Sequence, residues 1–403
     1  MINRTIDLYK NAYKGLTNKI WLLSVVMLIN RSGTMVLAFM TLYCNHIGFT
    51  IKQGGFVVAI YGVGALIGAL IGGKLSDKFG FYYTQFCALY LGGIMFIVLG
   101  LMKSYNAICV TTFFLAMINE SFRPANAAAI AHYSNPQNRT QSFSLVRLAI
   151  NLGWGVGSAL GGFLASVNYH LLFWVDGVTN ISAAILLLVI LPKVTKAQQL
   201  KVEVKSNKIE KNTSPYKDKI FLYFLVLQII FSSCFFQLFT TIPLFFKEGL
   251  LLSEFNIGVI MASGGILIAL FEMVIVYKLE GTKPYLKLMG YGTIFMALSF
   301  VILNFSFING FVIALISMII ITLGEMLSMP FMNSFYIARS TERTRGQYAG
   351  LYTMSWSVAQ ILGSSIGAAF AHAYGFKNLW FVVAFLCVFA SFGYRFLEKI
   401  KNQ

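Results

Sequence analysis

Charged residues are scarce in this chain of 403 residues: Asp, Glu, Lys and Arg together make up 11%, with 14 acidic residues against 31 basic ones. A soluble domain devotes about a quarter of its residues to charge, because its surface must face water. Hydrophobic residues instead make up 58% of this chain, and the mean hydropathy is +0.73. These values exclude an ordinary soluble domain and indicate that lipid surrounds most of the chain.

Cysteine and histidine are also few. The 5 cysteines lie in or at the ends of apolar runs, without the spacing of metal ligands. The 4 histidines lie far apart in the sequence, and the glycine-rich loop of a nucleotide-driven pump does not occur. We therefore expect no metal, no cofactor and no catalytic residue, which argues against an enzyme.

Long apolar runs recur along the chain, and a helix needs about 20 such residues to cross a hydrocarbon core of about 30 Å. The residue-by-residue alternation typical of a transmembrane barrel is absent. The first run is too long for the core of a secretory signal, so we expect it to remain as a span. The pattern predicts an all-α membrane protein with twelve transmembrane helices, at residues 20–45, 53–73, 83–102, 106–131, 141–168, 170–192, 220–246, 255–277, 286–304, 308–333, 347–374 and 378–396.

Basic residues give the chain a formal net charge of +17. They lie between the apolar runs and not on one face flanked by aromatic residues, so we expect no nucleic-acid partner. Alternate loops and termini hold 24 Lys and Arg on one side of the predicted spans and 4 on the other. Because cytoplasmic loops retain positive charge, we expect both termini in the cytoplasm, in a cell membrane such as the bacterial inner membrane.

One long polar interruption, from Pro192 to Lys219, separates the predicted spans into two groups of six. It contains 8 lysines and little hydrophobic periodicity, which is typical of a cytoplasmic linker. The sequence therefore predicts an N-terminal six-helix bundle at residues 1–192, a linker at 193–219 and a C-terminal six-helix bundle at 220–403.

The two halves also repeat each other. A shift of 206 residues aligns, without a gap, Pro124 with Pro330, Ser134 with Ser340, Arg139 with Arg345, Gln141 with Gln347, Gly157 with Gly363, Gly161 with Gly367 and Trp174 with Trp380. Chance would rarely align so many polar and glycine positions. Parallel repeats about an axis along the membrane normal are typical of transporters that work by rocking, so the repeat predicts two pseudo-symmetric bundles.

The loop between the second and third predicted spans runs from Gly73 to Gly80 and reads GKLSDKFG. It resembles the loop signature G-x-L-x-D-[RK]-x-G-[RK]-[RK] of the major facilitator superfamily, with aromatic residues in place of the closing basic pair. In that family the aspartate latches the two halves on the cytoplasmic side, so the resemblance implies this role for Asp77, with Gly73 and Gly80 of the same signature. Arg147, one or two turns inside the fifth predicted span, could reach the cytoplasmic interface, so we expect it to belong to the latch as well. An aspartate at this position can accept hydrogen bonds from helix N-terminal amides. The alternative is a solvated loop acid.

The fifth predicted span carries a glycine pattern. Its sequence GWGVGSALGG begins at Gly153 and resembles the motif G-x-x-x-G-P-x-x-G-G of the superfamily's drug/proton antiporters, with Ser158 in place of the proline. Gly153, Gly157 and Gly161 recur every four residues, which allows another helix to approach closely, and Gly162 completes the motif. The resemblance implies the twelve-span fold and proton antiport, while helix packing is the minimum role.

Ionisable residues inside predicted spans are the main functional candidates, because an unpaired charge at the bilayer centre costs at least about 2.5 kcal/mol. Arg31 and Glu120 both fall near the predicted midplane, so we expect them to interact. Arg123 offers Glu120 a second partner, and exchange between the two would accompany binding and release of a proton. The alternative is a permanent ion-pair cluster that orients helices.

Glu325, in the tenth predicted span, is a second candidate for proton coupling, because it is a lone carboxylate on an apolar helix. A hydrogen-bonded structural acid is the alternative reading. Aromatic residues make up 15% of the chain, so we expect some of them to face the predicted cavity, which suits a lipophilic ligand, including a cationic one. We expect the cavity wall to include Asn30, Arg31, Trp154, Gln237, Trp356 and Gln360.

These features predict a secondary active transporter that exports lipophilic compounds in exchange for protons. A rival reading is proton-coupled uptake of a metabolite or peptide. The segment from Asn30 to Gly33 is distantly similar to the arginine-bearing first span of peptide symporters, where Arg31 could hold a substrate carboxylate. In either case we expect a small-molecule substrate, protons and the lipid bilayer as partners, and a monomeric protein.

Overall fold

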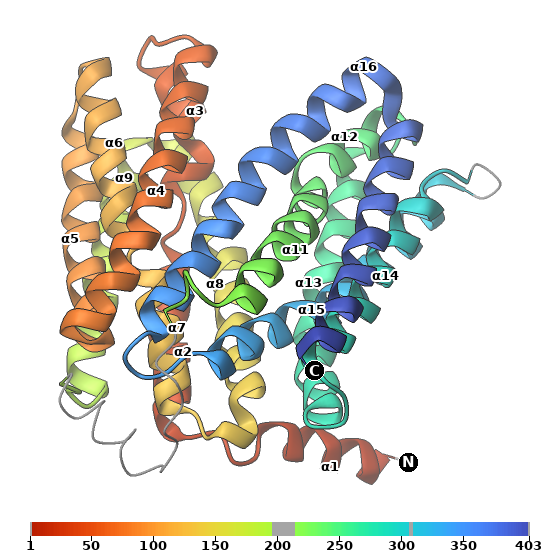
Figure 1. Cartoon of the computed structure of the whole chain (residues 1–403). Helices are drawn as coiled ribbons and strands as arrows, with labels where there is room; N and C mark the ends of the chain where they lie inside the picture. The colour runs from red at the N-terminus through yellow and green to blue at the C-terminus, as the bar shows by residue number, and fades with distance from the viewer. Residues whose placement is uncertain (1, 196–213, 306–308, 402–403) are drawn as a thin grey trace. The chain divides into compact units, whose positions relative to one another are not determined.

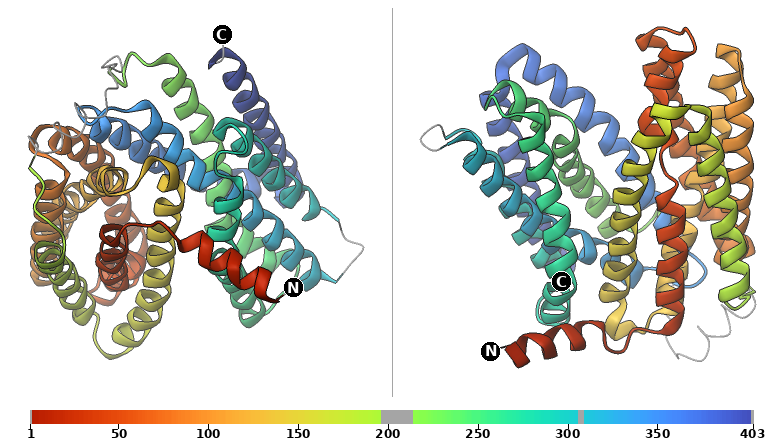
Figure 2. Two further views of the ribbon diagram at one scale, coloured as in Figure 1. Left: turned by 90° about the horizontal axis from the view of Figure 1, so that it is seen from below. Right: turned by 180° about the vertical axis from the view of Figure 1, so that it is seen from behind.

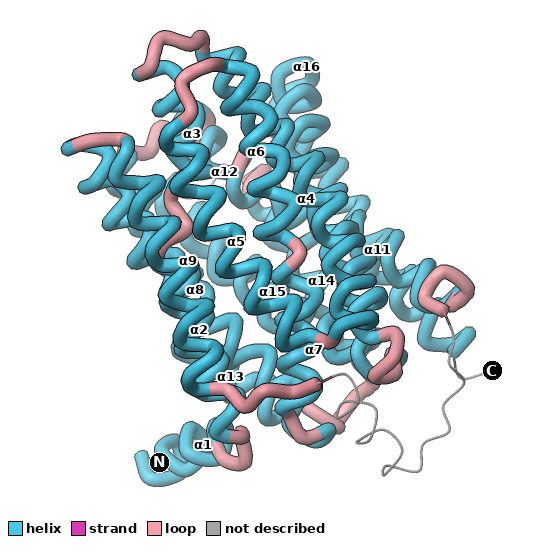
Figure 3. Tube along the Cα trace, turned by 90° about the vertical axis from the view of Figure 1, so that its left-hand side faces the viewer, coloured by secondary structure: helices cyan, strands magenta, loops and turns pink. Residues whose placement is uncertain are grey.

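The structure is a computed structural model that describes residues 2–195, 214–305 and 309–401. Every regular element in these residues is a helix, and Figures 1 and 3 show helices joined by short loops. Most of the predicted linker, residues 196–213, lies outside the described part.

The helices form two compact units. The N-unit comprises residues 16–215 and 340–354, and the C-unit comprises residues 1–15, 216–339 and 355–403. The predicted bundle boundaries at residues 192 and 220 stay a prediction. The N-unit contains α2 (Asn18–Ser32), α3 (Val36–His46), α4 (Ile51–Phe79), α5 (Phe81–Leu101), α6 (Tyr105–Glu120), α7 (Phe122–Tyr133), η1 (Pro136–Asn138), α8 (Arg139–Val167) and α9 (His170–Ile190).

The C-unit contains the remaining elements. They are α1 (Ile2–Tyr13), α11 (Lys219–Phe235), η2 (Phe236–Phe239), α12 (Thr241–Glu248), α13 (Glu254–Leu279), α14 (Tyr285–Ile302), α15 (Gly310–Arg339) and α16 (Arg345–Lys401), whose first residues belong to the N-unit. Glycine at position 375 has φ 79° and ψ 161°, so α16 is two helices joined at a kink.

Nine helical segments in the described residues are long and apolar enough to cross a membrane, and α16 is one of them. Because α16 contains two helices, it accounts for the last two predicted spans. The remaining two predicted spans are each interrupted: α2 continues into α3, and α6 continues into α7. The prediction of an all-α membrane protein with twelve spans is therefore confirmed.

The first and seventh spans are interrupted at equivalent places. The first breaks between Ser32 and Val36, and the seventh passes through η2 before α12 begins at Thr241. A shift of 206 residues carries Met35, the last residue of the first break, onto Thr241. The internal repeat of the sequence therefore extends to the structure, because the first span of each half is interrupted at an equivalent position. Broken helices in transporters are tolerated where they line a cavity or are buried in protein.

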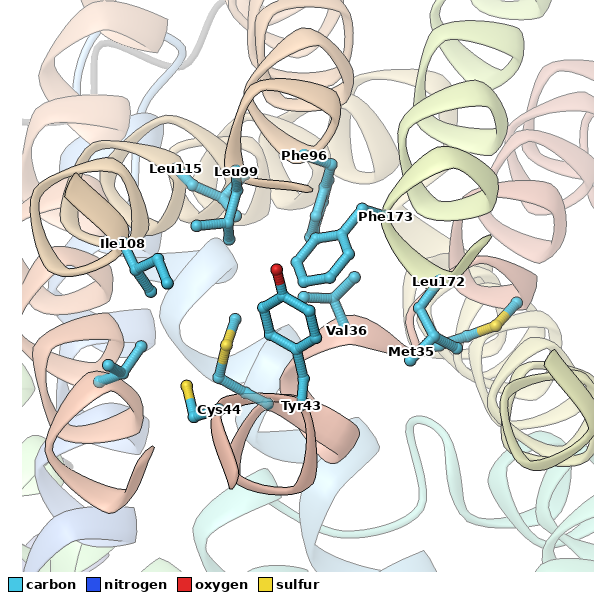
Figure 4. Close-up of a cluster of buried hydrophobic side chains, with 12 residues drawn as sticks. Met35, Val36, Tyr43, Cys44, Phe96, Leu99, Ile108, Leu115, Leu172 and Phe173 are labelled. Carbon is cyan, nitrogen blue, oxygen red and sulfur yellow. The ribbon is translucent and has the colours of Figure 1, made fainter. Parts of the chain in front are cut away.

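Helix pairing in the N-unit places α2 beside α8, α4 beside α6, and α5 beside α9 (Figures 1 and 2). Beyond the break in the first span, a cluster of buried apolar side chains joins α3 to the ends of α5, α6 and α9. Figure 4 shows Tyr43 within this cluster, and its ring lies edge-on to Phe173 with centroids 4.7 Å apart. This apolar core fixes the frame that holds the polar residues described next.

Candidate functional site

Glu120 is the last residue of α6, and the helix is interrupted directly after it. Its side chain is 7% exposed, and its Oε2 lies 2.7 Å from Nε of Arg123. Tyr61 of α4 donates a hydrogen bond from its hydroxyl to Oε1 of Glu120 at 3.3 Å. The amide of Asn119 donates to the same tyrosine hydroxyl at 3.4 Å. Residues from α4, α6 and α7 therefore form a hydrogen-bonded chain that ends on one buried carboxylate.

Arg123 is the accessible member of this ion pair, with 44% of its side chain exposed. In this conformation Glu120 pairs with Arg123, and the predicted ion pair between Arg31 and Glu120 is not formed among the described residues. Arg123 lies only three residues from Glu120 along the chain, whereas Arg31 belongs to another helix. The proposed exchange of partners stays a prediction.

Two glycines of α4 allow the close approach that brings Tyr61 to Glu120. A Cβ added to Gly68 would lie 2.3 Å from the carbonyl oxygen of Met117, and one added to Gly72 would lie 2.4 Å from that of Ser121. Real Cβ atoms do not approach so closely, so any larger residue would push α4 away from the fourth span.

Arg31 lies near the end of α2 and is buried, with 9% of the residue exposed. Its Nε is enclosed and has no hydrogen-bond partner among the described residues. The charged groups within electrostatic range of its guanidinium are those of Arg123 and Glu120, together with the hydroxyl of Tyr61. The structure thus brings Arg31, Glu120 and Arg123 within electrostatic range of one another, and Arg31 forms no ion pair within the part of the chain that the structure describes.

The glycine face of α8 packs on α2 at this arginine. A Cβ added to Gly153 would lie 2.7 Å from Cβ of Arg31, and one added to Gly157 would lie 3.1 Å from the Arg31 carbonyl oxygen. A Cβ on Gly161 would lie 2.9 Å from the ring of Phe39, whereas one on Gly162 would meet open space. Three of the four motif glycines are therefore at helix contacts in this structure.

Asp77 accepts hydrogen bonds from two backbone amides in the first turn of α16. The amide of Gly346 donates to Oδ1 at 2.7 Å, and the amide of Gln347 donates to Oδ2 at 2.8 Å. A helix N-terminus carries unpaired amides and a positive partial charge, so a carboxylate there is stabilised. Gly73 makes the approach possible, because its added Cβ would lie 2.5 Å from the Gly346 carbonyl oxygen.

The turn between α4 and α5 requires the glycine of the loop signature. Gly80 has φ 93°, in the region that residues with side chains rarely adopt, and its amide donates to the carbonyl of Ser76. Arg147 is half-buried on α8. Its part in the latch, like that of Gly80, stays a prediction.

A second charged group lies beside α16 and was not anticipated from the sequence. Glu342 forms an ion pair with Arg345, and its Oε2 lies 3.8 Å from Nδ1 of His132 at the end of α7. Burial alone would raise the pKa of Glu342, but Arg345 and His132 outweigh it and hold this pKa well below its ordinary value, at about 2. Neither loop length nor charge in the sequence predicted that Glu342 and His132, more than 200 positions apart, would meet.

The sequence profile described as Major Facilitator Superfamily matches residues 20–364, most of the chain. The chain belongs to the major facilitator superfamily. It is therefore a multi-pass membrane transporter, and its relatives include proteins named for quinolone resistance and for antiport.

Two bacterial relatives show the range of this similarity. The quinolone resistance protein NorA of Staphylococcus aureus is 21% identical over 336 residues, which cover 83% of this chain and 85% of that protein. A Na(+), Li(+), K(+)/H(+) antiporter of Planococcus maritimus is 23% identical over 411 residues, covering 93% of this chain and 94% of that protein.

Solved structures share the fold of this transporter at low sequence identity. A bacterial homologue of the iron transporter ferroportin, in an outward-facing state, aligns with a TM-score of 0.74 and 15% identity, covering 95% of this chain and all of that one. The human organic anion transporter MFSD10 aligns with a TM-score of 0.70 and 13% identity over 94% of this chain and all of that one. At such identity these likenesses show the fold alone.

The other residues predicted for the cavity of this transporter divide into two groups. Asn30 and Gln237 are buried, and both amides are hydrogen-bonded to neighbouring spans: Asn30 donates to Asn180 at 2.9 Å, and Gln237 donates to the carbonyl of Gly363 at 2.8 Å. The remaining three are partly or largely exposed, namely Trp154, Trp356 and Gln360. Glu325 is 7% exposed, within α15 of the C-unit. Their predicted roles in the cavity and in proton coupling stay predictions.

Asp176 has a structural role that the sequence analysis did not assign. From α9 its carboxylate accepts hydrogen bonds from the amides of Met35, at 3.0 and 3.1 Å, and of Val36, at 2.8 Å. These are the amides of the N-cap residue and of the first residue of α3, so Asp176 caps the helix that resumes after the break in the first span. The sequence shows only an acid inside an apolar run. Such an acid has either a functional role or a buried partner, and the sequence does not identify the role or the partner.

Proposed function

We propose that this transporter exports lipophilic compounds in exchange for protons, by alternating access, with Glu120 as the site that binds and releases the proton. The observation that carries the proposal is the environment of this carboxylate: it is buried, it accepts from Tyr61, and it pairs with the accessible Arg123. A carboxylate that is ionised in one conformation and protonated in another couples proton movement to the conformational change.

The ion pair with Arg123 supplies a means of switching. While Glu120 is ionised, Arg123 is held against it at 2.7 Å. When the carboxylate takes up a proton, the ion pair is lost, and the exposed arginine side chain is free to turn toward solvent. The hydrogen-bond chain from Asn119 through Tyr61 remains available to the neutral acid, because a protonated carboxyl still has acceptor capacity.

Asp77 supports the second requirement of such a cycle, a conformation that is held and then released. We propose that its bonds to the first turn of α16 are the latch, with Gly73, Gly80 and Arg147 as supporting residues. In this proposal the latch opens and closes once in each transport cycle, since two charge-assisted bonds are strong enough to bias a two-state equilibrium and weak enough to break.

Lipophilic substrates are supported by the aromatic character of the chain and by one relative. The C-unit contains a group of aromatic rings at the interrupted seventh span, where Trp356 lies edge-on to Phe235 and Phe236 with centroids 6.0 and 5.9 Å apart. The relative NorA is named for quinolone resistance. Proton-coupled uptake of a metabolite or peptide is the alternative, and the direction of coupled flux separates the two.

The test is transport by purified protein in proteoliposomes with an imposed pH gradient and a lipophilic dye. We expect the dye to move against the direction of proton flow, and Glu120→Gln to abolish this response while it keeps dye binding and exchange, because an amide cannot release a proton. Glu248→Gln, at the end of α12, is the matched control. Dye movement with the proton flow would support uptake instead, and full coupling in folded Glu120→Gln would move the proton site, with Glu325 as the next candidate.

We further propose that the protein is a monomer in the cell membrane with both termini in the cytoplasm. The charge asymmetry of the loops supports this orientation, with 24 basic residues against 4. Gel filtration in detergent with light scattering tests the oligomeric state.

A further inference from the structure

We infer that the C-unit carries a binding site for the headgroup of an anionic phospholipid, formed by Lys283, Tyr291 and Arg395. The ligand is a phosphodiester lipid with a net negative charge, of the class of phosphatidylglycerol. The inference goes beyond the proposed export function and does not depend on it. It is carried by two cations at one aromatic ring, by the charge of the helix ends around them, and by the exposed apolar face beside them.

Two cations lie over one tyrosine ring at the surface of the C-unit. Nζ of Lys283 is 4.9 Å from the ring centroid of Tyr291, and Cζ of Arg395 is 5.5 Å from the same centroid. The two charges are therefore at most about 10 Å apart, a separation comparable to the Debye length. The ring attracts both cations but neutralises neither. A phosphate beside the ring would lie close to both charges and offset their repulsion.

The lysine is positioned by the turn that joins α13 to α14. The hydroxyl of Tyr285 donates a hydrogen bond to Oε1 of Glu280 at 2.8 Å, which ties the start of α14 to the end of α13. Pro284 follows Lys283 directly, and a residue before a proline is restricted to extended backbone. The exposed lysine is thus presented from a constrained turn beside the first turns of α14.

The arginine is positioned by the packing of α14 on the second helix of α16 (Figure 1). The hydroxyl of Ser391 donates to the carbonyl of Gly290 at 2.8 Å. A Cβ added to Gly290 would lie 3.5 Å from Oγ of Ser391 and 3.7 Å from Cγ of Arg395. The stem of Arg395 therefore lies beside the residue that precedes Tyr291, and the guanidinium matches the paired oxygens of a phosphate.

The helix ends around this ring carry an excess of positive charge. Residues 278–291 and 391–401 together contain 6 basic residues and 2 acidic ones. Of the two acids, Glu280 accepts the hydrogen bond from Tyr285, and Glu398 is only 4% exposed. Basic pockets between transmembrane helices at the cytoplasmic side are suited to anionic headgroups, and these helix ends face the cytoplasm in the proposed orientation.

An exposed apolar face beside the arginine favours a lipid over a soluble phosphate compound. Four phenylalanines of α16 are between 55% and 69% exposed, and their spacing of three and four residues places them on one helix face: Phe385, Phe389, Phe392 and Phe396. The last two flank Arg395 in the sequence. A lipid whose headgroup lies at Arg395 can place its acyl chains along this face, whereas a soluble phosphate gains nothing from it.

The experiment measures lipid retention by native mass spectrometry of the full chain in detergent. The probes are phosphatidylglycerol and phosphatidylcholine with identical acyl chains. We expect the wild type to retain one phosphatidylglycerol molecule at a concentration at which phosphatidylcholine is lost. Lys283→Gln combined with Arg395→Gln should weaken phosphatidylglycerol binding about thirtyfold, the contribution expected of two basic residues beside an anionic headgroup. Binding of phosphatidylcholine should stay unchanged.

Lys399→Gln combined with Lys401→Gln is the matched control. It removes the same charge from the same end of α16, at two exposed lysines. This control should keep most of the phosphatidylglycerol binding, and Lys283→Arg combined with Arg395→Lys should keep the lipid preference, because both charges remain. Equal losses in the two glutamine pairs would show that net charge, and not a defined site, attracts the lipid, and would overturn the inference.

Three further outcomes overturn the inference. They are equal retention of the two lipids by the wild type, wild-type retention of phosphatidylglycerol by the folded double variant, and displacement of the lipid by inorganic phosphate at the same concentration. Thermal melting in detergent checks folding, and if the double variant does not fold, Lys283→Gln alone should weaken binding about fivefold. No substrate or pH gradient is present, so the result is independent of proton coupling.

Discussion

Carboxylates in this chain are stabilised by three different kinds of donor. Asp77 accepts from backbone amides at a helix start, Glu120 accepts from a tyrosine and an arginine, and Glu342 pairs with an arginine beside a histidine. The donor determines what each substitution removes. A change at Asp77 removes hydrogen bonds from backbone amides to a charge, a change at Glu120 removes the proposed proton site, and a change at Glu342 removes a salt-dependent ion pair.

Asp77→Asn should fold normally but lose most transport, because the variant keeps the shape of the side chain and loses the charge that faces two amides. A hydrogen bond to a charged group is worth about 1.5–3 kcal/mol, so the latched state would be weakened by more than tenfold. Transport rates in proteoliposomes, measured beside thermal melting, check this. Asp7→Asn, an exposed acid of α1, is the control. Unchanged transport by the folded variant would contradict the latch.

Glu342 should make the stability of the protein sensitive to acid. Because folding lowers the pKa of Glu342 from an ordinary 4.5 to about 2, its stabilising contribution is complete above pH 4.5 and is lost as the pH falls toward 2. The loss amounts to about 3 kcal/mol at most. Melting temperatures in detergent should therefore fall less steeply with acid in Glu342→Gln than in the wild type. Parallel curves for the two proteins would show that the ion pair contributes nothing.

At the scale of the element, the interrupted first span depends on residues from two other helices. Asp176 of α9 caps its second half, and the glycine face of α8 supports its first half. The break is therefore specified by tertiary contacts, since the sequence around it contains no proline and only one glycine, Gly33.

Asp176→Ala should destabilise the protein by about 2–4 kcal/mol, because it leaves the buried amides of Met35 and Val36 without an acceptor. Asp176→Asn should cost less, since its oxygen can still accept one bond. Chemical or thermal unfolding in detergent ranks the three proteins. Equal stability of the alanine variant and the wild type would mean that the cap does not hold the break.

Glycines within one helix should differ sharply in tolerance. Gly153→Ala should cost about 1–3 kcal/mol, because its Cβ would lie 2.7 Å from that of Arg31. Gly162→Ala should be neutral or slightly stabilising, because nothing lies near its added Cβ and alanine favours helix. Melting temperatures of the two variants test the contrast. Similar losses in both would show that the motif acts as a unit and not through local contact.

At the scale of the whole molecule, loop charge is the feature that sets orientation. We expect Lys205→Cys, in the predicted linker, to react with a membrane-impermeant maleimide only after the cytoplasmic side is opened. Lys103→Cys, in the exposed loop before α6, should react in intact cells. The reverse pattern would invert the topology, and reaction of both positions in intact cells would show that the cells leak.

The sequence by itself determined the membrane class, the twelve spans and the internal repeat, because these depend on local hydropathy and run length, which need no knowledge of neighbours. It also selected Arg31, Glu120 and Arg123, since ionised groups are conspicuous in apolar surroundings. Asp77 was selected by the resemblance of its loop to a family signature. Their partners were decided only by the tertiary structure.

Asp77 meets amides about 270 residues away, and Glu342 meets His132 across more than 200. Every residue except proline has a backbone amide, so the sequence does not show which amides Asp77 will meet. The choice between Arg31 and Arg123 as the partner of Glu120 depends on distances that only helix packing sets. The same holds for the repeat: alignment equates Arg31 with Gln237, but the packed structure satisfies the glutamine and leaves Nε of the arginine without a hydrogen-bond partner among the described residues.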